Sequence, residues 1–355
     1  MNESLSISLT PLSMGQMLDR AFRLYRAHFA KLVGIAAVAQ ILSFIFQAGI
    51  TSFTTLSLGI NPNQPPSPFL DDNYGIFIVL GIVSFIVIIA VSLLTQAALA
   101  KGISEAMFGK SFSVQSTYQD ILPYLGKLFL QLLALIGLSI AAGIWLIIPC
   151  VGWLTGPGMF VFISFISAFA VPILIIEQKT PTDAIYRAWY LLRKRFWYVL
   201  GYVFLIGLMT AIISGGLTAL VTFGGQALVA TNPSTGVLLT TQLVQIGVTA
   251  IVSAIILPLT IIAYLIFYFD LRIRTEGFDL TLQTHEGSDL SPADIVKITP
   301  SQADEKFMRR DDMLNFLYLS LIILALYAVL VGVIVGIGAL VATQSGDIFN
   351  SFPID

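Results

Sequence analysis

The sequence predicts an all-α, polytopic membrane helix bundle with about seven transmembrane helices. Three observations support this fold class: 57% of the 355 residues are hydrophobic, only 11% are charged, and the apolar residues form long runs. A soluble domain carries about 25% charged residues. So little charge does not cover a water-exposed surface on a chain of this length, and most of the surface is therefore expected to face lipid.

The apolar runs define the predicted membrane spans. A helix needs roughly 20 mostly apolar residues to cross the hydrocarbon core. None of the runs of that length carries Asp, Glu, Lys or Arg in its central part. Backbone groups inside a bilayer must hydrogen-bond to one another, so these runs are expected to be helices. The predicted spans are residues 31–57, 76–100, 127–149, 154–176, 198–223, 238–269 and 314–342.

The basic residues predict the orientation of these spans. All 18 Lys and Arg residues lie on one side of the alternating spans. The opposite-side loops, about residues 58–75, 150–153, 224–237 and 343–355, contain none. Because basic loops stay in the cytoplasm, this pattern predicts a multi-pass protein of a bacterial cytoplasmic (inner) membrane, with its N-terminus inside and its C-terminus outside. Residues 1–18 lack an early basic residue and a short apolar core, so no cleavable signal peptide is expected.

An internal repeat is predicted from two matching segments. Residues 20–34 read RAFRLYRAHFAKLVG and residues 187–201 read RAWYLLRKRFWYVLG, with Arg, Ala, Leu, Arg, Phe and Gly matching in register. A weaker third copy covers residues 113–129. Each unit is predicted to be an interfacial amphipathic helix followed by a transmembrane hairpin. The predicted organisation begins with a six-helix module, 1–280, with units of about 13–100, 101–177 and 178–280. A polar cytoplasmic linker, 281–312, follows and is expected to be flexible outside a short helix at Pro292–Val296. A seventh helix with a short outer tail covers 313–355.

The amphipathic helices carry most of the candidate interfacial residues. Ser13 with Gln16 fits a capping box, and Thr180 followed by Pro181 fits a second helix start. Apolar stripes alternate with basic faces, which are expected in the cytoplasmic headgroup layer beside anionic lipids. Two interpretations are open: a surface that senses lipid or docks a partner, or a simple anchor. The basic candidates are Arg20, Arg23, Arg26, Arg187, Arg193 and Arg195.

The sixth predicted span ends in FYFDLRIRTEGFDL, residues 267–280. On a continued helix, Asp270 faces Arg274 and Arg272 faces Glu276, both four residues apart. Gly277 is placed to end the helix in a left-handed conformation. The segment is interpreted either as a docking or phosphate-binding site built from the two arginines, or as a salt-bridged collar at the membrane surface.

Three stretches together resemble a broad group of uncharacterised bacterial multi-pass membrane proteins related to the membrane domain of glycerophosphoryl diester phosphodiesterases. They are GQMLDRAFRLYRAHF at 15–29, TPTDAIYRAWYLLRKRFW at 180–197 and FYFDLRIRTEGFDL at 267–280. The resemblance covers most of the chain up to about residue 280, and its last stretch is the most specific. It implies a six-helix membrane module of unassigned role. It does not imply phosphodiesterase activity, because the chain has no room for that barrel domain of about 250 residues.

The sequence predicts no enzyme, no cofactor and no metal site. It has no HExxH motif, no GxSxG elbow and no P-loop, and Gly156-Pro157-Gly158 is predicted to be a turn. One cysteine, Cys150, and two distant histidines, His28 and His285, do not make a metal cluster. A net charge of −2 indicates no nucleic-acid partner. The carboxylates from which an enzyme site would have to be assembled are Glu105, Asp120, Glu177, Asp183 and Asp270.

Two functions are predicted from these features. The first is a non-catalytic scaffold or accessory subunit with a membrane or cytoplasmic protein partner. The alternative is a transporter or lipid-handling protein with a polar-lined cavity near the candidate helix kinks, Pro172 and Pro258. A deep, polar, cytoplasm-facing cavity would favour the alternative. The polar residues available inside the spans are mainly Gln40, Gln47, Gln96, Gln131, Gln242 and Gln245.

Overall fold

The computed structural model describes residues 11–57, 69–284, 292–299 and 308–350. Every regular element in these residues is a helix, which confirms the predicted fold class. Seven of the described helices are long and apolar enough to cross a membrane, so the chain is a multi-pass integral membrane protein. These segments are Phe29–Ser57, Gly75–Met107, Val114–Trp145, Val151–Ile176, Phe196–Thr231, Thr235–Glu276 and Arg310–Val333.

A short helix precedes two long helices three times along the chain. The first set is α1 (Met14–Ala27), α2 (Phe29–Ser57) and α3 (Phe69–Met107). The second set is α4 (Val114–Ile121), the 3-10 turn η1 (Leu122–Tyr124), α5 (Leu125–Trp145) and α6 (Val151–Ile176). The third set is α7 (Pro181–Lys194), α8 (Phe196–Thr231) and α9 (Thr235–Glu276). This is the element order that the predicted repeat requires, and the duplication itself stays a prediction.

The short helices begin where their capping residues predict. Ser13 and Gln16 form a reciprocal capping box at α1, with distances of 2.8 and 3.3 Å. Thr180 accepts the backbone N–H of Asp183 at 3.2 Å, and Pro181 is the first residue of α7. Ser113 and Ser116 form a further capping box at α4. Each box satisfies amide groups that the first helical turn leaves without partners.

Several boundaries differ from the sequence prediction. The expected outer loop at 224–237 is mostly helix, because α8 continues to Thr231 and α9 begins at Thr235. The glycines at 156 and 158 lie inside α6 rather than in a turn. The linker contains α10 (Phe278–Thr284) and α11 (Pro292–Ile295), and α12 (Arg310–Asn350) begins within the region assigned to the linker. Apolar helices tolerate extra turns beyond the hydrocarbon, which explains why hydropathy alone made α8, α9 and α12 too short.

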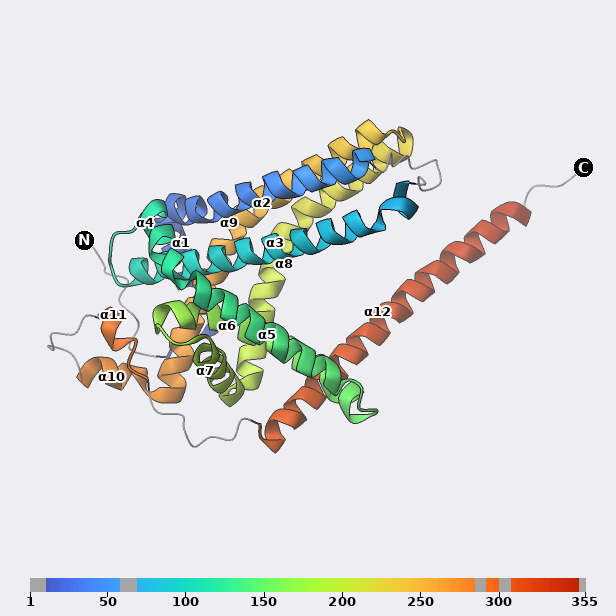
Figure 1. The fold of residues 1–355 in the computed structure, drawn as a ribbon. Coiled ribbons are helices and arrows are strands. Elements are labelled where there is room, and N and C mark those ends of the chain that lie inside the picture. Colours follow the sequence, from blue (N-terminus) through green and yellow to red (C-terminus); the bar gives the residue numbers. More distant parts are fainter. Residues whose placement is uncertain (1–10, 58–68, 285–291, 300–307, 351–355) are drawn as a thin grey trace, which may run out of the picture. The chain divides into compact units, whose positions relative to one another are not determined.

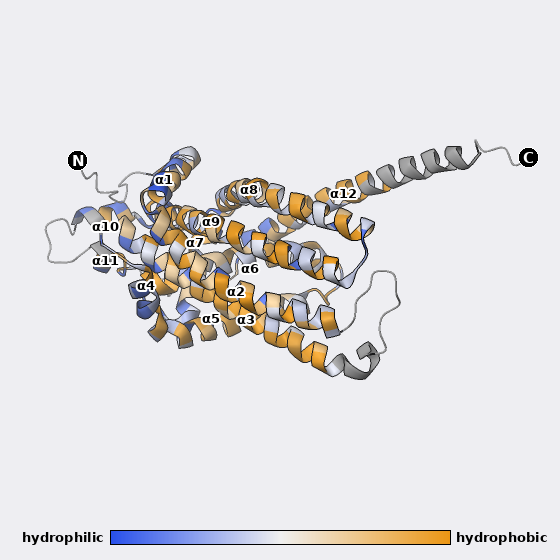
Figure 2. Cartoon of the chain, turned by 90° about the horizontal axis from the view of Figure 1, so that it is seen from above, coloured by the Kyte–Doolittle hydropathy of each residue, from blue (hydrophilic) through white to orange (hydrophobic). Residues whose placement is uncertain are grey.

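The chain divides into two compact units, and the first comprises residues 1–134 and 166–301. In this unit α9 packs against α1, α2, α3, α7 and α8. Figure 1 shows α2 and α9 lying side by side along their length. The C-terminal half of α9 is buried, and there Tyr202 of α8 stacks on Phe267 with 4.2 Å between ring centroids. Figure 2 shows the apolar colouring of the long helices and the polar colouring of α1, α4 and α10.

The second unit comprises residues 135–165 and 302–355. Here α6 and α12 touch at Gly158, whose backbone N–H donates to the Ser320 hydroxyl at 2.7 Å. A Cβ atom at Gly158 would lie 2.4 Å from the Phe316 carbonyl oxygen, so only glycine permits this approach. The predicted orientation puts Gly158 near the outer surface and Phe316 near the cytoplasm. If α6 and α12 both crossed the membrane in that orientation, these two residues would lie at opposite surfaces and would not touch. The contact therefore does not support the predicted crossing, and the outer C-terminus stays a prediction.

The two candidate kink residues lie inside helices that continue past them. Pro172 is buried within α6, and Pro258 is buried within α9. Proline has no N–H group, so Pro258 leaves the Ala254 carbonyl without its helical donor. The neighbouring Ile255 carbonyl accepts the Tyr25 hydroxyl of α1 at 2.7 Å. Burial raises the pKa of Tyr25, so this hydroxyl stays protonated and able to donate. A change of helix direction at either proline stays a prediction.

The predicted left-handed stop after α9 is confirmed and gives a stability test. Gly277 has φ 64° and ψ 40°, and a Cβ atom there would meet Leu280 Cδ1 at 3.5 Å, an ordinary contact distance. Gly277→Ala is therefore expected to lower the free energy of unfolding by about 1–2 kcal/mol through backbone conformation alone. Equilibrium unfolding in mixed micelles measures this change. The control is Gly216→Ala in α8, where the added methyl group meets nothing within 4 Å; equal destabilisation of both variants would contradict the conformational argument.

Candidate functional site

The last turns of α9 carry ion pairs on two opposite faces. Arg274 Nε lies 2.6 Å from Asp270 Oδ2, and Arg272 Nε lies 3.3 Å from Glu276 Oε2. Both pairs are four residues apart, as predicted from the sequence. Positions two residues apart on a helix point about 200° apart, so the two ion pairs contact different parts of the protein.

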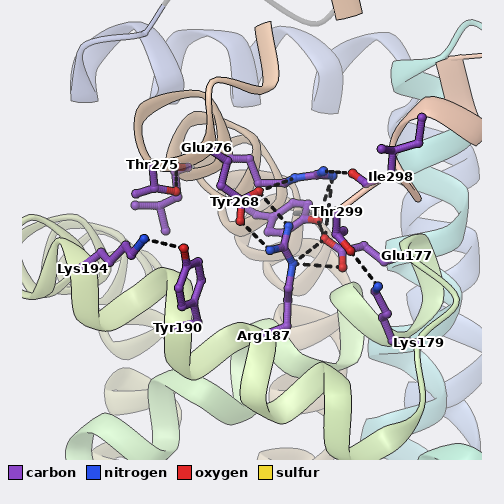
Figure 3. Close-up of polar contacts among 12 residues, drawn as sticks. Glu177, Lys179, Arg187, Tyr190, Lys194, Tyr268, Thr275, Glu276, Ile298 and Thr299 are labelled. Carbon is purple, nitrogen blue, oxygen red and sulfur yellow. Dashed lines mark hydrogen bonds and ion pairs between the residues drawn. The ribbon is translucent and has the colours of Figure 1, made fainter. Parts of the chain in front are cut away.

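On the first face, five residues from three segments form one buried charge cluster. We use this name for Glu177, which follows α6, Arg187 of α7, and Tyr268, Arg272 and Glu276 of α9 (Figure 3). Arg187 Nε donates to both oxygens of Glu177 at 3.1 Å, and its two terminal nitrogens meet the two oxygens of Glu276. Tyr268 donates to Glu177, and Arg272 Nη1 lies 3.7 Å from the same carboxylate.

The charge cluster is nearly inaccessible and its formal charge is balanced. The side chains of Glu177, Arg187, Arg272 and Glu276 are 0%, 3%, 1% and 3% exposed. Burial is the largest influence on the Arg187 pKa and lowers it, but the hydrogen bond to Glu276 and the charge of Glu177 outweigh it, so the pKa is raised overall. Arg187 therefore stays charged. Two carboxylates and two guanidinium groups compensate one another where water does not reach them.

Arg272 also holds the cytoplasmic linker. Its Nη1 donates to the Val296 carbonyl and its Nη2 donates to the Ile298 carbonyl, both at 2.8 Å. Lys179 donates to the Thr299 hydroxyl at 2.7 Å, and Val296 is fully buried. The short helix predicted at Pro292–Val296 is present as α11 (Pro292–Ile295). The sequence predicts flexibility for the residues that follow, but Ile298 and Thr299 are held by Arg272 and Lys179. Residues 285–291 and 300–307 lie outside the described residues. No sequence motif marks this contact, because main-chain oxygens accept the bonds.

On the second face, Asp270 and Arg274 hold the segment before α1. Asp270 Oδ1 accepts the Leu12 N–H at 2.9 Å, and Arg274 Nη2 donates to the Leu12 carbonyl at 2.6 Å. The Tyr198 hydroxyl of α8 donates to Asp270 Oδ2 at 3.2 Å. We call this arrangement the N-terminal clamp. It joins the beginning of the described chain, α8 and α9 at one point.

The first pair of matching arginines in the predicted repeat, Arg20 and Arg187, lies near the end of α9. Arg187 enters the charge cluster, whereas Arg20 of α1 lines a small cavity of about 20 Å³ with Leu12 and Asp270. Such a cavity has room for about one water molecule. Burial, and then the nearby charge of Arg23, lowers the Arg20 pKa. This shared placement agrees with the predicted repeat without establishing it.

The candidate docking residues differ in how exposed they are in the structure. Arg23, Arg26 and Arg195 are exposed, and Arg20 and Arg274 are intermediate. The remaining candidates are buried: Arg187, Arg193, Asp270, Arg272 and the side chain of Glu276. The buried group has no accessible surface for a partner, which corrects the prediction of a docking or phosphate site at the α9 exit and agrees with the salt-bridged alternative.

Helix α7 also differs from a helix that lies on a membrane surface. Ala184, Ala188, Trp189 and Leu192 are buried as one apolar stripe, but Tyr190, Leu191 and two arginines are buried as well. A helix packed on most of its sides belongs to the interior of a bundle. Arg187 is therefore an internal partner of carboxylates rather than part of a lipid-facing surface, whereas Lys194 at the end of α7 is exposed.

The other carboxylates considered for catalysis lie in local pairs. Lys101 contacts Glu105 at 3.2 Å and Asp120 at 3.5 Å, which ties α3 to α4. Asp183 accepts the Thr180 hydroxyl at 2.6 Å as part of the α7 cap. Among the described residues, no group of three or more His, Cys, Asp or Glu side chains is arranged to hold a metal ion. Cys150 is exposed at the turn between α5 and α6.

A groove with converging polar groups runs along α2 and α9 in the first unit. Its apolar stretch, of about 460 Å³, includes Val33, Ile41, Phe44 and Ile251. Its polar stretch has a volume of about 310 Å³. The polar side chains that line it are Gln40, Gln47, Thr51, Gln242, Gln245 and Thr249. Four of the glutamines noted in the spans thus lie together, which sequence alone did not predict.

Comparison with models of protein families, with curated proteins and with solved structures found no match. The resemblance to the phosphodiesterase-associated membrane domain therefore stays a prediction from the three sequence stretches.

The charge cluster predicts a large effect from loss of one cation. Arg187→Leu leaves Glu177 and Glu276 without their main partner, and breaking a buried pair in this way costs about 3–5 kcal/mol. Equilibrium unfolding in mixed micelles is the measurement. Arg23→Leu is the control, because the Arg23–Asp19 pair is 58% and 62% exposed, and such pairs contribute at most about 1 kcal/mol. Adding Glu276→Gln should recover part of the Arg187→Leu loss; stability of Arg187→Leu equal to the wild type would refute the role of the cluster.

The two faces of α9 predict separate effects on hydrogen exchange. Arg272→Lys keeps the charge but loses the fork that reaches the two linker carbonyls, so amides of residues 292–299 should exchange faster. Arg274→Lys should instead speed exchange at Leu12, because the Leu12 carbonyl loses its donor and the clamp loosens. Each variant is the control for the other. Faster exchange at both segments in both variants would show that the faces are not independent.

Proposed function

We propose that this protein is a non-catalytic scaffold or accessory subunit of a bacterial cytoplasmic membrane. The observation that carries this proposal is the charge cluster, which uses the ionisable groups at the end of α9 to fix other segments of the chain. A buried, fully paired network of this kind holds a surface in one shape, as a platform for a partner requires. The two carboxylates of the charge cluster are almost inaccessible to a substrate.

The non-enzymatic part of the proposal is supported by how the carboxylates are engaged. Glu177 and Asp270 bind arginines at the end of α9, while Glu105 and Asp120 share Lys101. General acid–base catalysis needs a titratable group within reach of a substrate. Glu177 and Asp270 are instead buried against their arginine partners, whereas Asp120 is paired but half-exposed.

The orientation is supported by the distribution of basic residues together with the arrangement of the first unit. Segments proposed to be cytoplasmic, namely α7, the linker and the residues before α1, all meet the C-terminal end of α9. In this orientation Arg23, Arg26 and Arg195 face the cytoplasm or the anionic headgroups. The family resemblance is compatible with this role, since it implies a membrane module without the catalytic barrel.

A second candidate function, lipid handling or transport, is favoured by the α2/α9 groove. Its polar stretch lies toward the end of α2 and the beginning of α9, which are the outer ends in the proposed orientation. It is therefore not the cytoplasm-facing cavity that would make transport the first choice, and the scaffold role remains the main proposal.

The scaffold proposal predicts a protein partner at fixed stoichiometry on the exposed basic face of α1. The test is native mass spectrometry of the protein extracted within a patch of its own membrane. We expect the double variant Arg23→Glu with Arg26→Glu to lose the partner, because it reverses two exposed charges without touching the charge cluster. The control Lys110→Glu reverses an exposed charge in the turn before α4 and should keep the partner. Wild-type protein without any protein partner would overturn the proposal.

A further inference from the structure

The α2/α9 groove changes character along its length. Thr51, Gln47 and Gln245 lie in its polar stretch, and Val33 and Ala37 lie in its apolar stretch. Gln40 and Ala250 line both stretches, so the two are continuous. From Gln40 to Thr51 the helix rises roughly 17 Å at 1.5 Å per residue. This length is close to half of the hydrocarbon core of about 30 Å. The polar stretch lies toward the predicted outer ends of the two helices, and the apolar stretch lies toward their predicted cytoplasmic ends.

The polar stretch has more hydrogen-bonding capacity than the described residues satisfy. Gln242 Oε1 accepts the Thr55 hydroxyl at 3.0 Å. In the part of the chain that the structure describes, the side-chain amides of Gln40, Gln47 and Gln245 have no hydrogen-bond partner. An amide left without a partner in hydrocarbon costs several kcal/mol. A group that hydrogen-bonds with them would therefore be bound favourably.

The lining of the groove indicates the chemistry of that group. Its polar side chains are amides and hydroxyls, and the lining contains no Asp, Glu, Lys or Arg. A charged headgroup would lose its hydration there without gaining an opposite charge. Amides both donate and accept, so they suit uncharged groups such as hydroxyls. The apolar stretch beside them suits a hydrocarbon chain.

A second copy of the chain is the alternative occupant. Docked through an apolar helix face it would leave the glutamine amides unpaired, whereas docked through its own α2 and α9 it would pair glutamine with glutamine, and the test below separates that outcome. An amphiphile has the same order of groups as the groove: a polar part near the membrane surface and a chain directed inward. Both stretches also lie within the range of about 300–1,000 Å³ typical of ligand sites.

We propose that the α2/α9 groove binds an amphiphile with an uncharged, hydroxyl-bearing headgroup, of which diacylglycerol is the simplest form. Gln47 and Gln245 hold the headgroup, and the stretch from Val33 to Phe44 receives an acyl chain. This inference does not depend on the scaffold role. It gives the second candidate function a ligand class.

The test uses the full chain reconstituted in phosphatidylcholine vesicles that contain a diacylglycerol with a diazirine on one acyl chain. After irradiation, mass spectrometry of peptides locates the label. We expect labelling on α2 and α9, and competition by unlabelled diacylglycerol. The double variant Gln47→Leu with Gln245→Leu removes both amides and should reduce labelling roughly tenfold, as expected for the loss of two hydrogen bonds.

The control variant is Gln96→Leu, because Gln96 lies on α3 outside the groove and donates only to Ser92, at 3.2 Å. It should be labelled like the wild type. Phosphatidic acid with the same photoactivatable chain should label the groove far less, since its phosphate is charged.

Equal labelling by both probes that the glutamine variant does not change would show only annular lipid, and would overturn the proposal. Absence of labelling, with a dimer that the glutamine variant converts to monomer, would show that a second copy occupies the groove and would overturn it as well. Loss of a protein partner from α1 variants would leave the labelling unaffected, so this inference and the scaffold proposal fail separately.

Discussion

The compensation of charges at the end of α9 is the constraint on which the arrangement of the first unit depends. Two carboxylates and two guanidinium groups lie where they are almost fully removed from water. Each alone would carry a large desolvation cost, and that cost is offset only when all four are assembled. Because the partners come from the end of α6, from α7 and from α9, assembly of the cluster and packing of these helices are one event.

This constraint explains why α7 is buried although its composition is that of a surface helix. Arg187 is accommodated inside the bundle because Glu177 and Glu276 accept its hydrogen bonds. The Tyr268 hydroxyl and the Phe278 ring, which lies 4.1 Å from the Arg272 guanidinium, complete the surroundings of the charges. Amphipathicity measured along one helix does not reveal such a partner, because the partner is distant in sequence.

Local structural features could be predicted from the sequence, whereas contacts between distant segments could not. The caps at Ser13 and Thr180, the two ion pairs of α9 and the stop at Gly277 depend on residues within four positions of each other, and all are present. The spans followed from hydropathy because lipid permits few alternatives. The Glu177–Arg187 pair, the hold on the linker and the gathering of glutamines along α2 and α9 depend on how helices pack, for which a single sequence has no local signal.

The N-terminal clamp and the hold on the linker share a property with a consequence for substitutions. Asp270 and Arg274 bind the main-chain N–H and carbonyl of Leu12, and Arg272 binds two main-chain carbonyls of the linker. The held segments are thus recognised by their backbone, which every residue supplies, except that proline at position 12 would remove the donor. Substituting the side chain of Leu12 or Ile298 should therefore leave these bonds intact, whereas substituting Asp270, Arg272 or Arg274 in α9 should remove them.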